Sequence, residues 1–234
     1  MHVHVASERN CEPEHHGRSS YKPVDWCEPM GRRFAELAFT PLVKQQQIQH
    51  GSRHLYERVE QSPDLGDRLG PDEQAFIEDS DGFYMASTTE NGWPYMQYRG
   101  GARGFLHVLD DRTIAFADLR GNKQYISVGN LQHDDRVALF FMDYPRQSRL
   151  KILGRAKVHE GTDEARKLIE QLRVPGEKSP AERALVIHIE AFDWNCPQHI
   201  TPRYTEEELT QVLEPIRQRL EALEAENKRL RASV

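Results

Sequence analysis

The chain has 234 residues, of which 38% are hydrophobic, and its formal net charge at pH 7 is −6. This length is sufficient to bury a sizeable core, and the negative charge argues against a broad nucleic-acid-binding surface. No apolar run approaches the roughly 18 residues of a membrane span, and the first ten residues carry no signal-peptide core. We therefore expect a cytoplasmic protein with neither a nucleic-acid partner nor a membrane partner.

The three cysteines, Cys11, Cys27 and Cys196, are an odd number at irregular spacing and do not indicate a disulfide framework. Cys11 and Cys27 lie near His15 and His16, but the spacing matches no zinc-binding pattern. No metal site is predicted.

The amino-terminal part of the chain is expected to be a polar arm followed by short helices. Residues 1–30 show no hydrophobic periodicity and are predicted to be extended or partly disordered. Residues 32–61 fit two helical pieces separated at Thr40-Pro41, because the residue before a proline leaves the helical region. Gly70-Pro71 then begins a short helix with proline at its first position. We expect the whole region 31–80 to pack on the strand-rich part of the chain.

A series of strand signals follows. Asn91-Gly92 lies between two alternating runs and predicts a tight hairpin, because both residues tolerate a positive φ. Residues 137–142 are continuously apolar, which is typical of a strand buried on both faces. The other expected strands are residues 83–89, 93–99, 105–109, 113–117, 150–158 and 184–192. Helical patterns at residues 122–131 and 162–173, inserted between these strands, indicate a barrel-like α+β core.

The carboxy-terminal segment carries a capping box and a heptad pattern. Thr205 and Glu208 have the spacing at which each side chain satisfies a free amide of the helix start. The seam consists of Leu209, Leu213, Ile216, Leu220, Leu223, Asn227 and Leu230. One asparagine at an a position, with leucine at d, fixes the register of a parallel two-stranded coil. An amphipathic helix packed on the chain's own barrel also fits, and Pro215 is expected to kink or restart the helix.

The first candidate site is Arg99-Gly100-Gly101. Glycine allows backbone to approach a ligand closely, and the planar guanidinium of arginine can hold two phosphate oxygens at once. An ordinary bulge in a strand also fits this sequence.

The second candidate site lies where a strand ends and a helix is expected to begin. Its residues are Phe116, Ala117, Asp118, Asn122, Lys123 and Gln124. A helix amino terminus presents free N–H groups and a partial positive charge, which attract phosphate. With Asn122 and Lys123 in the first turn, two or three charge-assisted hydrogen bonds of about 1.5–3 kcal/mol each would hold a phosphate monoester. A solvated loop with an ordinary N-cap is the alternative.

A third basic group begins at Arg146 and continues through Arg149, Lys151 and Arg155. Arg149 and Lys151 are two residues apart in an expected strand, so they share one face and can reach a ligand from the barrel wall.

Together these stretches, within residues 81–192, resemble the pyridoxamine 5′-phosphate oxidase-like family of FMN-binding split barrels. The most specific part is the run AFADLRGNKQYISVGNL, followed by DDRVALFFMDYP and RLKILGRAKV. The resemblance implies an α+β fold with an antiparallel six-stranded split β-barrel, flanking helices and a carboxy-terminal helix. It also implies a homodimer with FMN at the subunit interface. The barrel is assigned to residues 81–200, and residues 201–234 to the carboxy-terminal helix, with its potential coiled coil.

In this family a strand end, a turn similar to Gly-Ser-Arg-Lys, a helix and an Arg-Val strand hold the FMN phosphate. The resemblance implies that Arg99, Lys123 and Arg149 neutralise that phosphate here. The remaining cofactor-binding residues that it implies are Gly100, Gly101, Phe116, Ala117, Asp118, Asn122 and Gln124. The turn in this chain, residues 121–124, has one cation where the oxidase has two.

The oxidase's late Arg-Leu-His motif and its set of substrate-phosphate ligands are absent, so oxidation of vitamin B6 is not expected. His199 and Arg203, after the last strand, fit either a cover over the flavin ring or a structural bridge to the final helix.

The sequence predicts an FMN-binding oxidoreductase that acts on an unknown small-molecule substrate or electron donor, without an identified catalytic residue. The alternative is a non-catalytic flavin- or heme-binding carrier or sensor module. A heme-degrading barrel is a third hypothesis and requires a histidine at the ligand. The candidates for it are His107, His133, His188 and His199.

Overall fold

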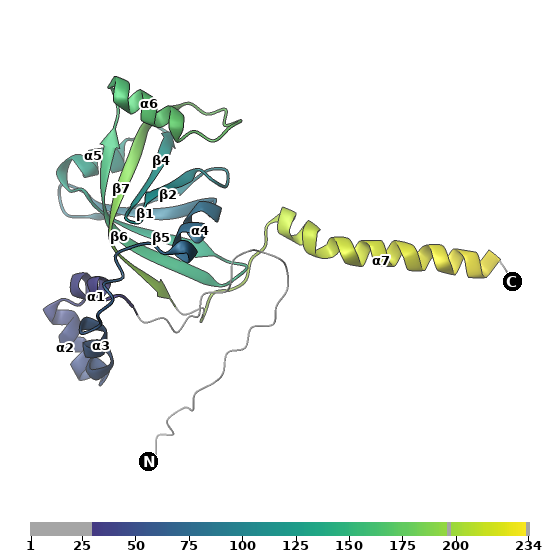
Figure 1. Ribbon diagram of the computed structural model, residues 1–234, viewed down its shortest axis with the longest axis horizontal. Helices are drawn as coiled ribbons and strands as arrows, with labels where there is room; N and C mark the ends of the chain where they lie inside the picture. The colour runs from purple at the N-terminus through teal and green to yellow at the C-terminus, as the bar shows by residue number, and fades with distance from the viewer. Residues whose placement is uncertain (1–29, 196–197, 233–234) are drawn as a thin grey trace, which may run out of the picture. The chain divides into compact units, whose positions relative to one another are not determined.

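The computed structural model describes residues 30–195 and 198–232 (Figure 1). Within these ranges the chain divides into two compact units, residues 30–203 and residues 204–232. The predicted polar arm, except Met30, and all three cysteines lie outside the described residues.

Four helices precede the sheet: α1 (Arg32–Ala38), α2 (Pro41–Gln49), α3 (Arg53–Glu60) and α4 (Pro71–Asp79). The break predicted at Thr40-Pro41 is confirmed, and the Thr40 hydroxyl accepts a hydrogen bond from the Val43 N–H at 3.4 Å. A second break, at Gly51 with a φ of 74°, separates α2 from α3. Positive φ carries no steric penalty for glycine, which explains the position of this break.

A single antiparallel sheet has the strand order β2-β1-β5-β6-β7-β4-β3. The strands are β1 (Gly82–Thr88), β2 (Pro94–Gly100), β3 (Leu106–Asp110), β4 (Thr113–Leu119), β5 (Arg136–Asp143), β6 (Ser148–His159) and β7 (Ala181–Asn195). The six strands implied by the family resemblance are therefore wrong. The described residues form seven, as many as the strands expected from the residue pattern, and the short β3 joins the edge of the sheet by pairing Leu106 with Phe116.

The predicted hairpin between β1 and β2 is confirmed, but its turn differs from the expected tight type. Only Gly92 has a positive φ, 84°, whereas Asn91 does not. The Thr89 N–H donates to the Trp93 carbonyl at 2.9 Å, which closes a loop longer than two residues.

Inward-facing side chains of the strands form the main core. Phe83 stacks on Phe141 with ring centroids 5.0 Å apart, and Phe116 meets Phe83 edge-on at 5.6 Å. The prediction that β5 is buried on both faces is wrong. Its alternate residues Val137, Leu139 and Phe141 are buried, but the residues between them are only half-buried.

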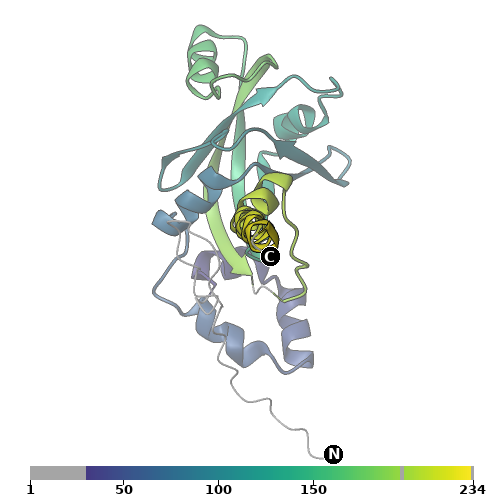
Figure 2. The same ribbon diagram turned by 90° about the vertical axis from the view of Figure 1, so that its right-hand side faces the viewer.

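The other helices of the first unit are α5 (Ile126–His133) and α6 (Asp163–Gln171). The Thr162 hydroxyl caps α6 by accepting a hydrogen bond from the Ala165 N–H at 3.1 Å. Figures 1 and 2 show α6 at one end of the sheet and α1, α2 and α3 at the opposite end. Ala165 of α6 and Leu172, the residue directly after the helix, are buried, which supports the helical pattern predicted over residues 162–173.

An ion pair between the half-buried Lys151 and the buried Asp193 joins β6 to β7. The Lys151 ammonium lies 2.6 Å from an Asp193 carboxylate oxygen and 5.0 Å from the centre of the Phe34 ring. Asp193 is only 5% exposed. Burial raises the pKa of Asp193, although Lys151 and Arg149 act in the opposite direction.

We expect Lys151→Met to lower the free energy of unfolding at neutral pH by about 1–3 kcal/mol, because it leaves the Asp193 carboxylate buried without its cation. A carboxyl group whose pKa is higher in the folded state binds protons more tightly there, so stability is lost as the pH rises through that pKa. The deficit should therefore shrink in acid. Urea denaturation across a pH series measures it, with the exposed Lys157→Met as control. A deficit that does not vary with pH would contradict this prediction.

The second unit contains one helix, α7 (Glu206–Ala232). The predicted capping box is confirmed, since the Glu208 N–H donates to the Thr205 hydroxyl at 3.2 Å and the Thr205 N–H donates to the Glu208 carboxylate at 2.8 Å. Pro215 lies inside the helix, which continues past it, so the helix does not restart there. None of the described helices is long and apolar enough to cross a membrane.

Candidate functional site

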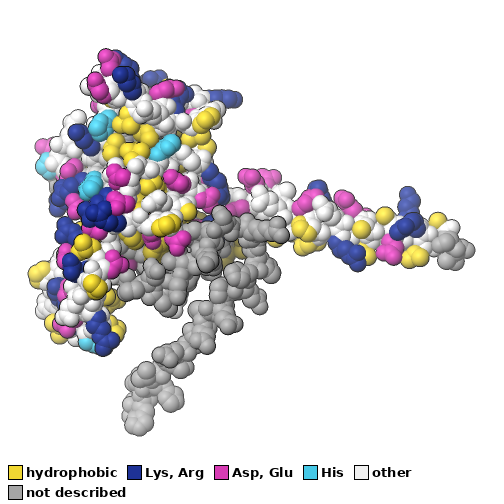
Figure 3. Space-filling view, viewed as in Figure 1, with side chains coloured by type: hydrophobic (Ala, Val, Ile, Leu, Met, Phe, Trp, Pro, Cys, Tyr) yellow, Lys and Arg dark blue, Asp and Glu magenta, His cyan; other side chains and the backbone are white. Residues whose placement is uncertain are grey.

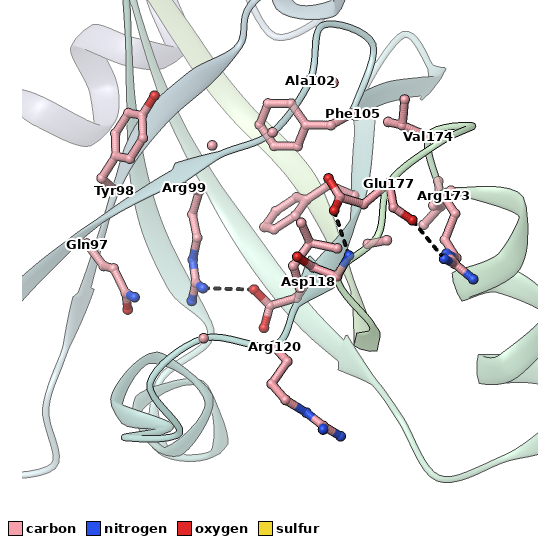
Figure 4. Close-up of a pocket in the computed structure, with 18 residues that line it drawn as sticks. Gln97, Tyr98, Arg99, Ala102, Phe105, Asp118, Arg120, Arg173, Val174 and Glu177 are labelled. Atoms are coloured by element: carbon pink, nitrogen blue, oxygen red, sulfur yellow. Dashed lines mark hydrogen bonds and ion pairs between the residues drawn. The ribbon is translucent and has the colours of Figure 1, made fainter.

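A cavity of about 300 Å³ lies at the ends of β2 and β4 (Figure 4). β2 contributes Arg99 to its wall, β4 contributes Asp118, and the segment after α6 contributes Arg173 and Glu177. A smaller cavity of about 50 Å³ shares Arg99 and Asp118 with it and continues toward the start of α5. We call the two together the β2–β4 cleft.

Asp118 holds two arginines at this cleft. One carboxylate oxygen lies 2.8 Å from the Arg99 Nη1, and the other lies 3.0 Å from the Arg183 Nη1. Asp118 is 4% exposed, and Figure 4 shows Arg99 reaching toward it from β2. The Arg99 Nε is also buried but has no hydrogen-bond partner among the described residues. This donor is therefore available to an acceptor outside the protein, such as a ligand oxygen or a water molecule.

Further carboxylates balance the positive charges of the other arginines at the cleft. The Arg183 Nε pairs with Glu160 at 2.9 Å, and its Nη2 pairs with Glu182, also at 2.9 Å. Burial disfavours the charged form of Arg183, but its hydrogen bonds to Glu160 and Asp118 outweigh that effect and raise its pKa. Glu182 also accepts a hydrogen bond from Arg120 at 2.7 Å, which lowers the pKa of Glu182.

Lys123 differs from these arginines because it has no ion-pair partner within residues 30–195 and 198–232. It lies in the turn between β4 and α5, is exposed, and borders the smaller cavity. Among the described residues of the cleft, Lys123 is therefore a cation without an ion-pair partner, and Arg99 and Arg173 each have a buried Nε without a hydrogen-bond partner.

The prediction that α5 begins with Asn122 and Lys123 in its first turn is wrong. The helix begins at Ile126, because Lys123 and Tyr125 have φ values of 62° and 53°, outside the right-handed helical region. The Asn122 side-chain oxygen accepts a hydrogen bond from the Gln124 N–H at 3.2 Å. Asn122, Lys123 and Gln124 nevertheless border the smaller cavity together with the first residues of α5.

Gly100 and Gly101 are closely packed against aromatic rings of the same chain, so their missing side chains make room for these rings. A Cβ on Gly100 would lie 2.7 Å from the Tyr98 ring, and a Cβ on Gly101 would lie 2.7 Å from the Phe105 ring. Gly121 borders both cavities, and a Cβ there would meet nothing within 4 Å. Its place in the cleft leaves open space beside the backbone. Phe116 and Ala117 also border the larger part of the cleft.

A family model described as pyridoxamine 5′-phosphate oxidase matches residues 69–196, more than half of the chain. The chain belongs to the pyridoxamine 5′-phosphate oxidase family. The matched range includes all seven strands, β1 to β7, and therefore the strands that build the cleft. The chain matches no curated protein sequence.

Three solved structures are similar to this chain at low sequence identity. A putative pyridoxamine 5′-phosphate oxidase from Lactobacillus delbrueckii is 23% identical, with 54% of this chain and 94% of that chain covered and a TM-score of 0.42. HupZ from Group A Streptococcus is 14% identical, with 58% and 99% covered and a TM-score of 0.45. An FMN-binding protein from Syntrophomonas wolfei is 14% identical, with 65% and 94% covered and a TM-score of 0.38. No functional conclusion follows from these likenesses.

Arg149 does not join the β2–β4 cleft in this family member. It lies beside a separate cavity of about 700 Å³ on the outer face of β1, β5 and β6. The Arg149 Nε is buried without a hydrogen-bond partner in the described part of the chain. The neighbouring Arg146 pairs with Asp143 at 2.6 Å and does not border the cleft.

His199 and Arg203 lie beside this outer cavity as well, and the Arg203 guanidinium lies 4.8 Å from the centre of the Tyr144 ring. Among the other candidate histidines, the His107 Nε2 is 3.1 Å from the Leu172 carbonyl, and His188 is exposed on β7. His133 forms the last residue of α5.

Sequence reasoning missed Arg183, which organises the cleft with Asp118. The two residues are directly paired across β4 and β7. Leu185 and Ile187 follow Arg183 at alternate positions and are fully buried. The sequence did contain a signal for this residue. Arg183 stands at the same alternate positions as the apolar residues of the strand, and alternate residues of a strand share one face, so it is expected to point inward with them.

Proposed function

We propose that this chain is an FMN-binding oxidoreductase of the split-barrel class that acts on a small molecule as a homodimer. The observation that carries the proposal is the buried Arg99 Nε without a partner, in a cleft that Lys123 also borders. A phosphate oxygen would supply the missing acceptor, and charge-assisted hydrogen bonds to phosphate are among the strong ones in proteins. The proposal includes closure of the seven-stranded sheet as a split barrel within residues 81–200, on which the helices of residues 31–80 pack.

In this proposal Arg99 and Lys123 bind the phosphate, and Gly121 leaves room for it beside the backbone. Asn122 and Gln124 contribute amide groups, whereas Gly100, Gly101, Phe116 and Ala117 form the neighbouring wall. Asp118 is a positioning residue, because both of its oxygens already hold arginines. A bound flavin supplies hydride-transfer chemistry, and the protein orients it.

In this proposal, Arg149 contributes to the cofactor site of a second copy of the chain. The outer face of β1 and β2 is apolar and open, with Tyr84 38%, Met96 64% and Tyr98 55% exposed. The larger cavity of the β2–β4 cleft, at about 300 Å³, is at the lower end of the volumes typical of cofactor sites. We infer that the outer face pairs with a second copy, which completes the cofactor site and brings Arg149 to the partner's flavin.

We expect Met96→Glu to weaken FMN binding at least about tenfold, because desolvating a carboxylate at the paired face costs more than about 1.4 kcal/mol. Met96 borders the outer cavity and is not among the residues that line the β2–β4 cleft, so it tests the pairing and not direct contact within the cleft. Fluorescence titration measures the affinity, with Leu109→Glu, an exposed apolar residue of β3, as control. Unchanged binding by Met96→Glu would overturn the shared site.

The proposed function is tested by the absorption spectrum of the freshly purified protein and by titration with FMN. Flavin bands, or uptake of FMN by the colourless protein, are the expected results. A protein that neither carries nor takes up FMN would refute the proposal. A Soret band would favour the heme-binding alternative.

A flavin carrier without turnover is the second candidate. It is favoured by the three carboxylates around the arginines of the cleft, Asp118, Glu160 and Glu182, all of which are engaged in ion pairs. None of these three is free to serve as a catalytic acid or base. Reduction of the bound flavin by NADPH or NADH under anaerobic conditions, followed by turnover with an acceptor, distinguishes an oxidoreductase from a carrier.

A further inference from the structure

The apolar seam of α7 is exposed along the helix. Seam residues Leu213, Ile216 and Leu220 are 53%, 63% and 56% exposed. Figure 3 shows hydrophobic side chains along α7, interspersed with charged ones. None of the residues described in this helix is buried. Exposed apolar residues that form a continuous stripe indicate a surface that binds a partner.

We propose that α7 pairs with α7 of a second copy as a parallel, in-register, two-stranded coiled coil. This inference is independent of the flavin site and adds a second contact between the two copies. The seam repeats every 3.5 residues on average from Leu209 to Leu230, which is the period of a left-handed coil. Pro215 falls at the outer c position of the heptad, where its ring faces away from the partner helix.

The charges beside the seam complement one another between two copies. In a parallel coil, a residue at g faces the e residue five positions later on the partner helix. Arg219 therefore faces the partner's Glu224, and Glu226 faces the partner's Arg231. None of these four residues forms an ion pair with any described residue of its own chain, although Arg217 pairs within the helix with Glu214 at 2.9 Å. The g and e positions are therefore available to a partner.

Asn227 favours a parallel orientation of the two helices and a second copy of the chain as the partner. In a parallel, in-register dimer the two Asn227 amides lie opposite each other and can hydrogen-bond. Opposite a leucine, as in an antiparallel or shifted pair, each amide would be buried unpaired at a cost of about 1–3 kcal/mol. Only a second copy in register places an asparagine opposite Asn227 as a matter of symmetry, so a second copy is the partner to which we assign the seam.

Disulfide cross-linking tests this arrangement in the full chain, with Cys11, Cys27 and Cys196 replaced by serine. Leu223→Cys places a thiol at a seam d position, opposite its own copy. Ala225→Cys, at the outer f position, is the matched control. Mild oxidation should cross-link the first variant and not the second. In an antiparallel pair centred on the seam, the Leu223 thiols would be about 10 Å apart along the axis at about 1.5 Å per residue, too far for a disulfide.

Adding Leu220→Asp to the Leu223→Cys chain should abolish the cross-link, because it buries a carboxylate in the seam, whereas Ala222→Asp at an outer position should preserve it. Glu224→Arg should reduce the cross-link, and the pair Arg219→Glu with Glu224→Arg should restore it.

Absence of cross-linking at position 223, or equal cross-linking at 223 and 225, would overturn the coil, whether the seam is covered by residues of the same chain or by another protein. FMN uptake measured on the same samples reports on the flavin site separately, so failure of one proposal is distinguishable from failure of the other.

Discussion

Replacing Asp118 with asparagine is expected to lower the free energy of unfolding by about 3–5 kcal/mol, the usual cost of removing one partner from a buried ion pair. Asp118 is 4% exposed and holds Arg99 at 2.8 Å and Arg183 at 3.0 Å. Asparagine preserves the shape of the side chain, but it removes the negative charge and replaces one acceptor oxygen with a donor. Chemical denaturation followed by circular dichroism measures the loss.

Asp111→Asn is the matched control for this prediction. Asp111 pairs with Arg68 at the surface, at 2.5 Å and with both side chains exposed, and such pairs are usually worth less than about 1 kcal/mol. In Asp118→Asn, Arg99 loses its carboxylate partner, whereas Arg183 keeps Glu160 and Glu182. Inorganic phosphate should therefore stabilise this variant more than the parent chain. If the two substitutions cost the same, Asp118 does not have the central role that we assign to it.

The double variant Arg99→Ala, Lys123→Ala is expected to weaken FMN binding by a factor of about 10²–10⁴, because each lost charge-assisted hydrogen bond is worth about 1.5–3 kcal/mol. Arg99 supplies the unpaired Nε, and Lys123 supplies the cation without an ion-pair partner in the described chain. Fluorescence titration of FMN against the apoprotein gives the affinity. The fold should persist, since Asp118 retains its pair with Arg183.

Riboflavin provides the chemical control for this variant, because it has the same ring as FMN but no phosphate. The loss of affinity should be large for FMN and small for riboflavin. Arg68→Ala with Lys157→Ala removes two exposed cations outside the cleft and should leave both affinities unchanged. An equal loss for the two ligands would place the phosphate elsewhere and contradict the assigned site.

Local features of the chain were predictable from the sequence alone. Pro41 can start a helix but cannot continue one, so the break before α2 follows from Thr40-Pro41. The hydroxyls of Thr162 and Thr205 cap α6 and α7 because a capping side chain bonds an amide only a few residues away. Most strands followed from their period of two, since that alternation depends on adjacent residues.

The helix start at Ile126 shows the limit of such local rules. The pattern of apolar residues from Asn122 onward was compatible with a helix. The positive φ values of Lys123 and Tyr125, however, lie outside the right-handed helical region, so the helix cannot begin before them. Nothing in the residue types at these two positions requires a left-handed backbone. The turn is instead accompanied by a tertiary contact, in which the Arg183 guanidinium lies 5.1 Å from the centre of the Tyr125 ring.

The sequence by itself therefore determined the family resemblance, most of the strands and the heptad pattern of the last helix, because each depends on residues close together in the chain. Only the tertiary structure decided which charges meet. Asp118 and Arg183 are 65 positions apart and are joined by the register of β4 with β7. Arg149 was separated from Arg99 because the two side chains border different cavities of the sheet. Pairing register and side-chain direction between distant strands depend on packing of the whole core, and no local pattern specifies them.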